Sequence, residues 1–211
     1  MRFDPFVDAA RRYYTETFLR HGAVAAGVDW RDADSQNLRF EQLLKIDDRD
    51  GDFSVNDYGC GYGALAEWLA SHGFNARYHG FDVSPPMLEH ARRAFSRRED
   101  VVFVDRLADL PVADYTVASG VFNVKQDAGT REWTEYVVDT IRAIRSKSGL
   151  GLSFNMLTSY SDPERMRPDL YYADPAFFFD LCKRELSPRV ALLHDYGLWE
   201  FTILVRLESA P

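Results

Sequence analysis

Cysteine is scarce in this chain of 211 residues, which contains only Cys60 and Cys182. Two cysteines form neither a disulfide framework nor a metal site. Long apolar runs are also absent, because no stretch reaches the roughly 18 apolar residues that a membrane-spanning helix needs. The first residues carry no apolar signal core. We therefore expect a reduced, cytoplasmic protein that holds no metal and has no membrane partner.

Basic residues are outnumbered, since 25 Lys and Arg stand against 33 Asp and Glu, giving a formal net charge of −8. A nucleic-acid surface needs clustered Lys and Arg that face phosphates, so no nucleic-acid partner is expected. The nearest approach to a basic patch lies on an expected helix, where its members should form a solvated face: Arg92, Arg93, Arg97 and Arg98. The length fits a single domain, with a helical N-terminal part over residues 1–50 and a core over 51–211.

Glycines do occur in one concentrated pattern, Asp57-Tyr-Gly59-Cys-Gly61-Tyr-Gly63-Ala64, directly after a short β-prone run. Alternate glycines allow a tight turn and let the backbone lie close to a ligand. The helix that follows offers unpaired N–H groups, which favour a carboxylate or phosphate. The loop fits a dinucleotide pattern, with Ala64 in the last position. It also resembles motif I of the class I S-adenosylmethionine (SAM)-dependent methyltransferases, D-x-G-x-G-x-G.

Asp82 ends the next expected strand, 19 residues after Gly63. A carboxylate at this place can accept two hydrogen bonds from a ribose diol. The alternative is that Asp82 caps the following helix, although Ser84 is placed for that role. A ribose contact suits SAM and NAD equally, so Asp82 alone does not separate them.

The residues around Asp82 strengthen the resemblance, because Asp82-Val-Ser-Pro-Pro-Met-Leu-Glu-His-Ala is similar to the methyltransferase pattern D-x-S-x-x-M-L-x-x-A. The resemblance implies that Val83 packs on the adenosine and that Met87 lines the adenine pocket, unless it is simply core. The acid after the third strand, Asp105, stands one position earlier than is usual in the family. The adenine contact is therefore either Asp105 or the backbone near Arg106 and Leu107.

The similar blocks cover residues 53–124 in family order and imply SAM as the cofactor. Ser119 and Gly120 would lie under its methionine part. Arg39 could clamp the SAM carboxylate or could be a surface arginine. Together, the residues expected to contact the cofactor are Asp57, Gly59, Cys60, Gly61, Gly63, Asp82, Val83, Met87, Asp105, Arg106, Leu107, Ser119, Gly120 and Arg39.

Strand-like and helical runs alternate from Phe53, which predicts a parallel sheet covered on both faces. The last two strand-like runs, 189–194 and 199–207, predict a hairpin. With the resemblance, this gives an α/β fold with a seven-stranded, doubly wound, mostly parallel sheet, an antiparallel C-terminal hairpin and an N-terminal helical lid. The other expected strands are 53–58, 76–82, 101–104, 115–119 and 149–156, and the expected helices are 5–20, 35–46, 63–71, 84–97, 130–144 and 174–184.

A small-molecule acceptor with an oxygen or nitrogen nucleophile is the expected methyl recipient. The residues expected to face it are Trp30, Asn123, Tyr171 and Tyr172, with Tyr14 and Gln36 helping to close the lid. For Asn123, the alternative is a turn-forming role. No carboxylate–histidine pair stands out by spacing, so no catalytic base is named. An NAD-binding oxidoreductase and a non-catalytic SAM-binding module remain the alternative functions.

Overall fold

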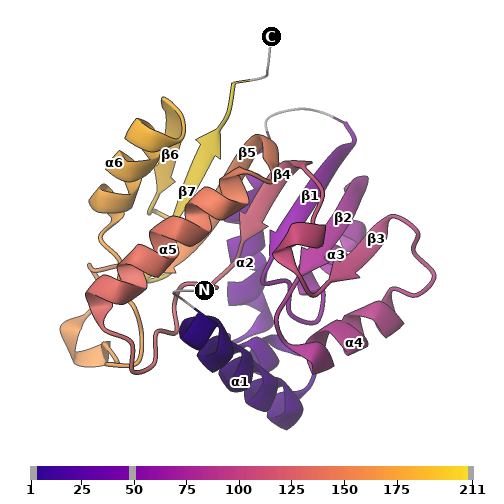
Figure 1. The fold of residues 1–211 in the computed structure, drawn as a ribbon, viewed down its shortest axis with the longest axis horizontal. Coiled ribbons are helices and arrows are strands. Elements are labelled where there is room, and N and C mark those ends of the chain that lie inside the picture. The colour runs from indigo at the N-terminus through magenta and orange to yellow at the C-terminus, as the bar shows by residue number, and fades with distance from the viewer. Residues whose placement is uncertain (1–3, 48–50, 209–211) are drawn as a thin grey trace.

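The computed structural model describes residues 4–47 and 51–208 (Figure 1). The predicted boundary at residue 50 lies outside these residues. A seven-stranded sheet with the order β3-β2-β1-β4-β5-β7-β6 forms its centre. The strands are β1 Phe53–Tyr58, β2 Ala76–Phe81, β3 Val101–Val104, β4 Ala113–Ala118, β5 Ser148–Leu157, β6 Arg189–Leu193 and β7 Glu200–Arg206.

The first five strands are parallel, whereas β7 runs antiparallel to both β5 and β6. This arrangement confirms the predicted fold, including the C-terminal hairpin. Parallel strands all end at the same edge of the sheet. The ends of β1, β2 and β4 therefore meet at one place, although they are far apart in the sequence.

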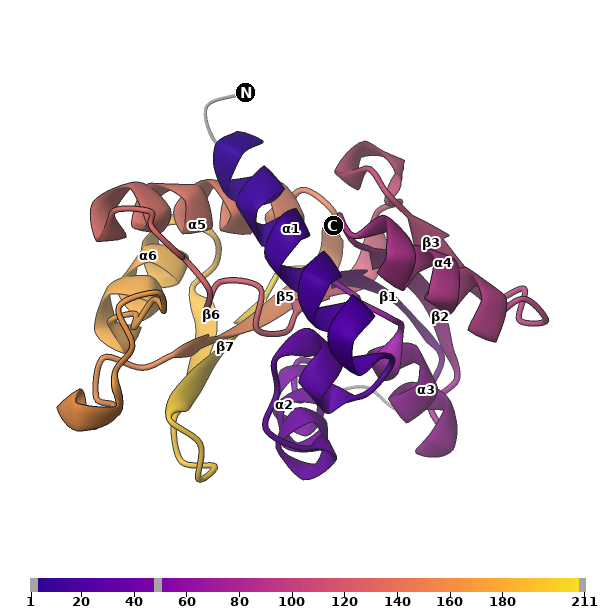
Figure 2. The ribbon, with the colours of Figure 1, turned by 90° about the horizontal axis from the view of Figure 1, so that it is seen from below.

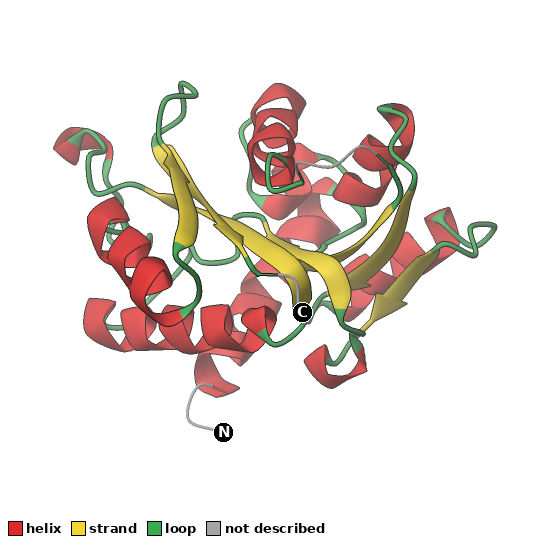
Figure 3. Cartoon of the chain, turned by 90° about the horizontal axis from the view of Figure 1, so that it is seen from above, coloured by secondary structure: helices red, strands yellow, loops and turns green. Residues whose placement is uncertain are grey.

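Helices cover both faces of the sheet (Figure 3), and a hydrophobic core lies beneath the helices of each face. Helices α2 (Ala33–Leu44), α3 (Ala64–Ser71) and α4 (Pro85–Ala94) pack on one face through side chains such as Leu43, Leu69 and Leu88. Helices α5 (Thr130–Arg145) and α6 (Pro175–Glu185) cover the other, through Val137 and Phe178. None of the described helices is long and apolar enough to span a membrane.

Helix α1 (Asp4–His21) lies across the edge where the parallel strands end (Figure 2). The short helix η1 (Ala25–Val28) lies in the connection between α1 and α2. Of the two predicted N-terminal helices, α1 therefore covers the sheet edge, while α2 packs into a core. The remaining short helices are η2 Leu107–Asp109 and η3 Pro163–Arg165.

The helix starts differ from the sequence prediction in detail. Asp32 caps α2, because its carboxylate accepts the N–H of Ser35 at 2.8 Å; Ser35 itself is inside the helix. Helix α4 does begin after Ser84, but the Ser84 hydroxyl does not cap it. That hydroxyl is hydrogen-bonded to Thr15 Oγ1 at 2.8 Å, which ties α1 to the start of α4.

Candidate functional site

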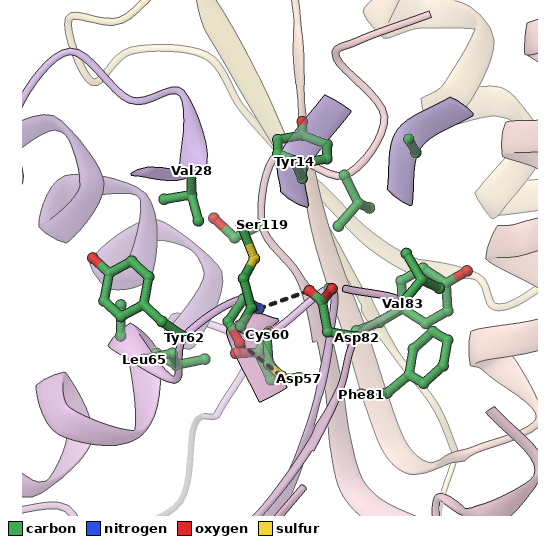
Figure 4. Close-up of a pocket in the computed structure, with 18 of the residues that line it drawn as sticks. Tyr14, Val28, Asp57, Cys60, Tyr62, Leu65, Phe81, Asp82, Val83 and Ser119 are labelled. Carbon is green, nitrogen blue, oxygen red and sulfur yellow. Dashed lines mark hydrogen bonds between the residues drawn. The ribbon is translucent and has the colours of Figure 1, made fainter. Parts of the chain in front are cut away.

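A cavity of about 310 Å³ lies where β1, β2 and β4 end, beneath α1. Figure 4 shows Asp82 near its middle, with Tyr62 and Leu65 to one side, Phe81 and Val83 to the other, and Tyr14 above. Most of its walls come from the segments that the sequence singled out. This follows from the topology, since the loops after neighbouring parallel strands converge where the strand order reverses, between β1 and β4.

The glycine loop forms the floor of the cavity. Gly61 has a φ of +55°, a conformation that residues with a Cβ rarely adopt. A Cβ built there would lie 3.1 Å from Val28 Cγ1 and 3.7 Å from Met87 Sδ, so it would occupy the space above the loop. Glycine therefore leaves room for a ligand against the backbone. Gly59 and Cys60 also line the cavity, whereas Gly63 caps α3 and does not.

Asp82 is buried and fixes the loop to the end of β2. One carboxylate oxygen accepts the N–H of Gly61 and the other accepts the N–H of Ser84, both at 2.8 Å. Asp82 does not cap α4, because the N–H that it accepts belongs to Ser84, the residue before the first turn, and not to a residue within that turn. Each oxygen retains a second lone pair for a diol in the cavity. Burial raises the pKa of Asp82.

Asp57 is the second carboxylate of the cavity, and it accepts a hydrogen bond of 2.6 Å from the hydroxyl of Tyr78. Burial raises the pKa of Asp57 to about 7, with a smaller contribution from the negative charge of Asp82. Within residues 4–47 and 51–208, no lysine, arginine or histidine lines the cavity. Its charged groups are both acidic, which favours a ligand with a positive charge.

Ser119 supplies an unused polar atom at the wall of the cavity. Its Oγ is buried and has no hydrogen-bond partner in the described part of the chain. A buried hydroxyl without a partner is costly. A polar group of a ligand at this end of the cavity would remove that cost. The apolar lining expected for an adenine is present at Val83, Met87 and Leu107.

Two expected adenine contacts lie outside the cavity wall. Asp105 and Arg106 are exposed, and the Arg106 guanidinium binds Asp109 through hydrogen bonds of 2.7 and 2.9 Å. Of the two alternatives, the structure brings the segment at Leu107 to the cavity and leaves the Asp105 carboxylate in solvent. The prediction for the Asp105 carboxylate is corrected accordingly, and of the backbone alternative only Leu107 reaches the cavity wall.

Arg39 is neither placed to clamp a SAM carboxylate in the cavity nor a surface arginine, the two positions considered from the sequence. It is buried, and its guanidinium is paired with both carboxylate oxygens of Glu200. It does not line the cavity, and it is not a surface residue. Its charge is therefore already used by a protein carboxylate, which corrects both alternatives.

Three of the four predicted acceptor residues also lie away from the cavity. Asn123 is buried, and its amide oxygen accepts the N–H of Leu157 at 3.1 Å. Tyr171 is bound through its hydroxyl to Thr134, and the Tyr172 hydroxyl accepts the N–H of Arg167. These contacts hold loops together, so the predicted substrate roles are corrected. Trp30, like Tyr14 and Gln36, does line the cavity.

Other lining residues come from segments without a motif, although one of them, Tyr14, was expected to help close the lid. Val7, Ala10 and Tyr14 reach the cavity from α1 at helical spacing. That spacing predicts a helix with one apolar face, but it does not say what the face covers. Tyr58, Phe81 and Tyr136 line the cavity from β1, β2 and α5.

Comparison with known proteins decides the family. A family model described as a methyltransferase domain matches residues 55–146. The chain is 52% identical over 157 residues to "Putative methyltransferase Rv1506c" of Mycobacterium tuberculosis (strain ATCC 25618 / H37Rv), across 74% of this chain and 95% of that protein. The chain belongs to the class I methyltransferases. Its cofactor is SAM, so the alternative of an NAD-binding oxidoreductase is dropped.

Solved structures show the same fold at low sequence identity. Magnesium protoporphyrin IX methyltransferase from Synechocystis PCC 6803, with bound S-adenosylhomocysteine (SAH), has a TM-score of 0.62 at 17% identity, covering 95% of this chain and 99% of that one. N-methyltransferase NodS from Bradyrhizobium japonicum WM9, in complex with SAH, has a TM-score of 0.64 at 15% identity, covering 93% and 97%. The [4+2]-cyclase SpnF has a TM-score of 0.65 at 12% identity, covering 100% and 98%. A cyclase among these neighbours means that the shared fold does not fix the reaction.

Proposed function

We propose that this methyltransferase transfers the methyl group to a small-molecule acceptor through an oxygen or nitrogen nucleophile. The observation that supports it most directly is the cavity of about 310 Å³ beneath α1. This volume is at the lower end of the range for small-molecule sites, roughly 300–1,000 Å³. A cavity of this size suits small ligands, whereas a folded macromolecule would have to displace α1 to reach it.

The proposed cofactor contacts follow from the lining. Asp82 accepts hydrogen bonds from the ribose diol, and Val83, Met87 and Leu107 enclose the adenine. The loop at Gly59–Gly61 and the Ser119–Gly120 segment take the amino-acid part, where the Ser119 hydroxyl has a hydrogen bond to give. When bound, SAM supplies a methyl group made electrophilic by its sulfonium.

The chain's own contribution to the reaction is alignment and the exclusion of water. Val7, Ala10 and Tyr14 close the cavity from α1. Burial raises the pKa of Tyr14 far above neutral, so its hydroxyl stays protonated and can donate a hydrogen bond to the acceptor. No histidine, among the residues that the structure describes, lines the cavity. An acceptor whose nucleophile is unprotonated near neutral pH therefore suits this site best.

The test is transfer of tritium from methyl-labelled SAM to a panel of small alcohols, phenols, carboxylates and amines. We expect label in a low-molecular-mass product. Label found only in protein or nucleic acid would contradict a small-molecule acceptor. Failure to retain labelled SAM at all would instead contradict the proposed cofactor site.

Tyr14→Phe should lower kcat/KM for the identified acceptor by about tenfold, roughly the value of one neutral hydrogen bond with good geometry. The dissociation constant for SAH should change little, because the proposed partner of this hydroxyl is the acceptor. Tyr160→Phe is the matched control, since the Tyr160 side chain is exposed. An equal loss in both variants, or a loss confined to SAH binding, would count against an acceptor-orienting Tyr14.

Binding of SAH should weaken up to about tenfold between pH 8 and pH 6, because Asp57, with a pKa of about 7, gains a proton over this range. A neutral carboxyl no longer attracts the ammonium group of the ligand. Tyr78 and Cys60, which face Asp57, stay protonated throughout because burial raises their pKa values. Calorimetry at pH 6, 7 and 8 measures the effect, and an unchanged pH profile in Asp57→Asn would refute it.

The same group predicts the opposite trend for stability without ligand. The folded-state pKa of Asp57, about 7, lies above the unfolded value of about 3.9. The folded state therefore binds the proton more tightly, and the Asp57 contribution to the free energy of unfolding increases as pH falls from about 8 to about 4. Urea unfolding of wild type and Asp57→Asn across this pH range measures the effect. The difference between the two proteins is the Asp57 contribution, because the other carboxylates are common to both.

A further inference from the structure

A buried chain of polar contacts connects α2 to the cavity wall. Arg39 Nε donates to the two carboxylate oxygens of Glu200 at 3.0 and 2.9 Å, and Nη2 also contacts this carboxylate. Arg39 Nη1 donates to the carbonyl oxygen of Ser35 at 2.6 Å. Glu200 is 1% exposed and Arg39 is 7% exposed, so this ion pair is shielded from water.

The chain continues from Glu200 to the site. The amide nitrogen of Asn155 donates to Glu200 Oε2 at 2.7 Å, and the Asn155 amide oxygen accepts the N–H of Gly120 at 2.7 Å. Asn155 is fully buried in β5, opposite Thr202 of the antiparallel strand β7, and Glu200 is the first residue of β7. Gly120 lines the cavity. One end of the polar chain therefore holds a backbone group of the cavity wall.

Its other end holds an aromatic ring of the same wall. The Arg39 guanidinium carbon lies 3.8 Å from the ring centroid of Trp30, a cation–π contact. Trp30 also lines the cavity, and its ring lies directly against Gly120. A Cβ added to Gly120 would be only 2.2 Å from Trp30 Cζ2. The two ends of the network thus meet at one point of the cavity, one through Gly120 and the other through Trp30.

Stability alone gives little reason for such an arrangement. Replacing a buried ion pair by apolar residues is often neutral or stabilising, because taking two charges out of water is costly. A buried network in which each charge has partners does, however, fix the positions of the groups it joins. The groups joined here are Gly120, in the segment proposed to take the amino-acid part of the ligand, and the Trp30 ring that lies against it.

We propose that Arg39, Glu200 and Asn155 are positioning residues, which hold Trp30 and Gly120 in the place where they enclose the amino-acid part of the cofactor. This inference rests on the proposed orientation of SAM in the cavity. It gives Arg39 a role through Trp30 and Glu200 rather than by direct contact with the ligand carboxylate.

The test compares SAH with 5′-methylthioadenosine, which lacks the amino-acid part. We expect Arg39→Met, Glu200→Gln and Asn155→Ala each to weaken SAH binding by about tenfold, as for one lost hydrogen bond, and 5′-methylthioadenosine by less than about threefold. Arg142→Met is the control, because it breaks an exposed ion pair with Glu185 on the surface. It should change neither ligand's affinity.

A spectroscopic readout distinguishes positioning from general loss of stability. In protein labelled with 5-fluorotryptophan, the ¹⁹F signal of Trp30, assigned with Trp30→Phe, should shift in Arg39→Met, Glu200→Gln and Asn155→Ala. The signals of Trp68 and Trp133 should not. An unchanged Trp30 signal with unchanged SAH affinity would overturn the proposal. Weaker SAH binding in Arg39→Met alone would also overturn it, because that result makes Arg39 a direct ligand of the carboxylate.

A double variant guards against misfolding caused by an unpaired buried charge. Arg39→Met with Glu200→Gln removes both charges and leaves an oxygen for Asn155 to bind. We expect it to fold and still to show the shifted Trp30 signal and weaker SAH binding, since the guanidinium is gone. Wild-type values for both would refute positioning. Wild-type protein that binds no SAH would instead refute the proposed cofactor site.

Discussion

Replacing Asp82 by alanine should weaken SAH binding by about 100-fold or more. Hydrogen bonds to a charged group contribute about 1.5–3 kcal/mol each, and the proposed ribose contact has two. Their loss amounts to about 3–6 kcal/mol, which is two to four orders of magnitude in affinity. Calorimetry on the folded variant measures the change directly.

A second effect adds to this loss, because Asp82 also shapes the floor of the cavity. Its carboxylate holds the N–H groups of Gly61 and Ser84. Without it, the glycine loop loses its link to the end of β2, and the backbone that should lie against the ligand is no longer fixed. We therefore expect the thermal stabilisation by saturating SAH, which wild type should show, to disappear in Asp82→Ala.

The control is Asp114→Ala, which removes a comparable carboxylate from the opposite edge of the sheet. Asp114 Oδ2 accepts the backbone N–H of Ser54 at 2.7 Å and its hydroxyl at 2.8 Å, so the variant also loses a bond to the backbone. It should lose stability while its SAH affinity stays at the wild-type value. Wild-type SAH affinity in Asp82→Ala, or an equal loss of SAH affinity in both variants, would contradict the assignment of Asp82 to the cofactor.

The parts of the site that the sequence predicted are those encoded locally. The glycine loop and Asp82 each follow directly after a strand, and parallel strands end at a common edge. Once the strands were assigned, their ends had to converge. In the structure, the Gly61 N–H donates to the Asp82 carboxylate at 2.8 Å. The resemblance to methyltransferases supplied the ligand, which the spacing left open between SAM and NAD.

The parts that were wrong depend on partners distant in the sequence. Arg39 and Glu200 are 161 residues apart, and nothing near either residue indicates that they pair. The carboxylate of a SAM molecule and that of a glutamate are chemically equivalent partners for a guanidinium. Sequence reasoning could assign the type of partner to Arg39 but not its source.

Asn123 shows the same limit for a residue close to a motif. It follows β4, at the end of the blocks that resemble the family, but its amide oxygen accepts the N–H of Leu157 on the neighbouring strand. A backbone N–H at the end of a buried strand needs an acceptor. The N–H of Leu157 in β5 is such a group, and it determines that the Asn123 amide bonds to the protein backbone. This need is visible only once the position of β5 next to β4 is known.

Replacing Gly120 by alanine should disturb both the fold and the site. Gly120 has a φ of +69°, where a side chain costs about 1–2 kcal/mol. The added Cβ would also lie 2.2 Å from Trp30 Cζ2 and 2.3 Å from Cη2. Because overpacking costs a further 1–3 kcal/mol or so, we expect the free energy of unfolding to fall by about 2–5 kcal/mol.

The binding of SAH should fall by at least about tenfold in Gly120→Ala, since the Trp30 ring must leave its place in the cavity wall. Gly73→Ala is the matched control. Gly73 has a φ of +76°, but a Cβ there meets no atom within 4 Å. It therefore carries the backbone strain without the collision, and it should lose about 1–2 kcal/mol of stability with no change in SAH affinity.

A double-mutant cycle identifies the indole as the cause. If the collision with Trp30 accounts for the excess cost, Gly120→Ala should be no worse than Gly73→Ala in a background that carries Trp30→Ala. Urea unfolding of the four proteins gives the interaction free energy. A cycle that closes to zero would mean that the two residues act independently, and the cavity wall would then not depend on the contact between Gly120 and Trp30.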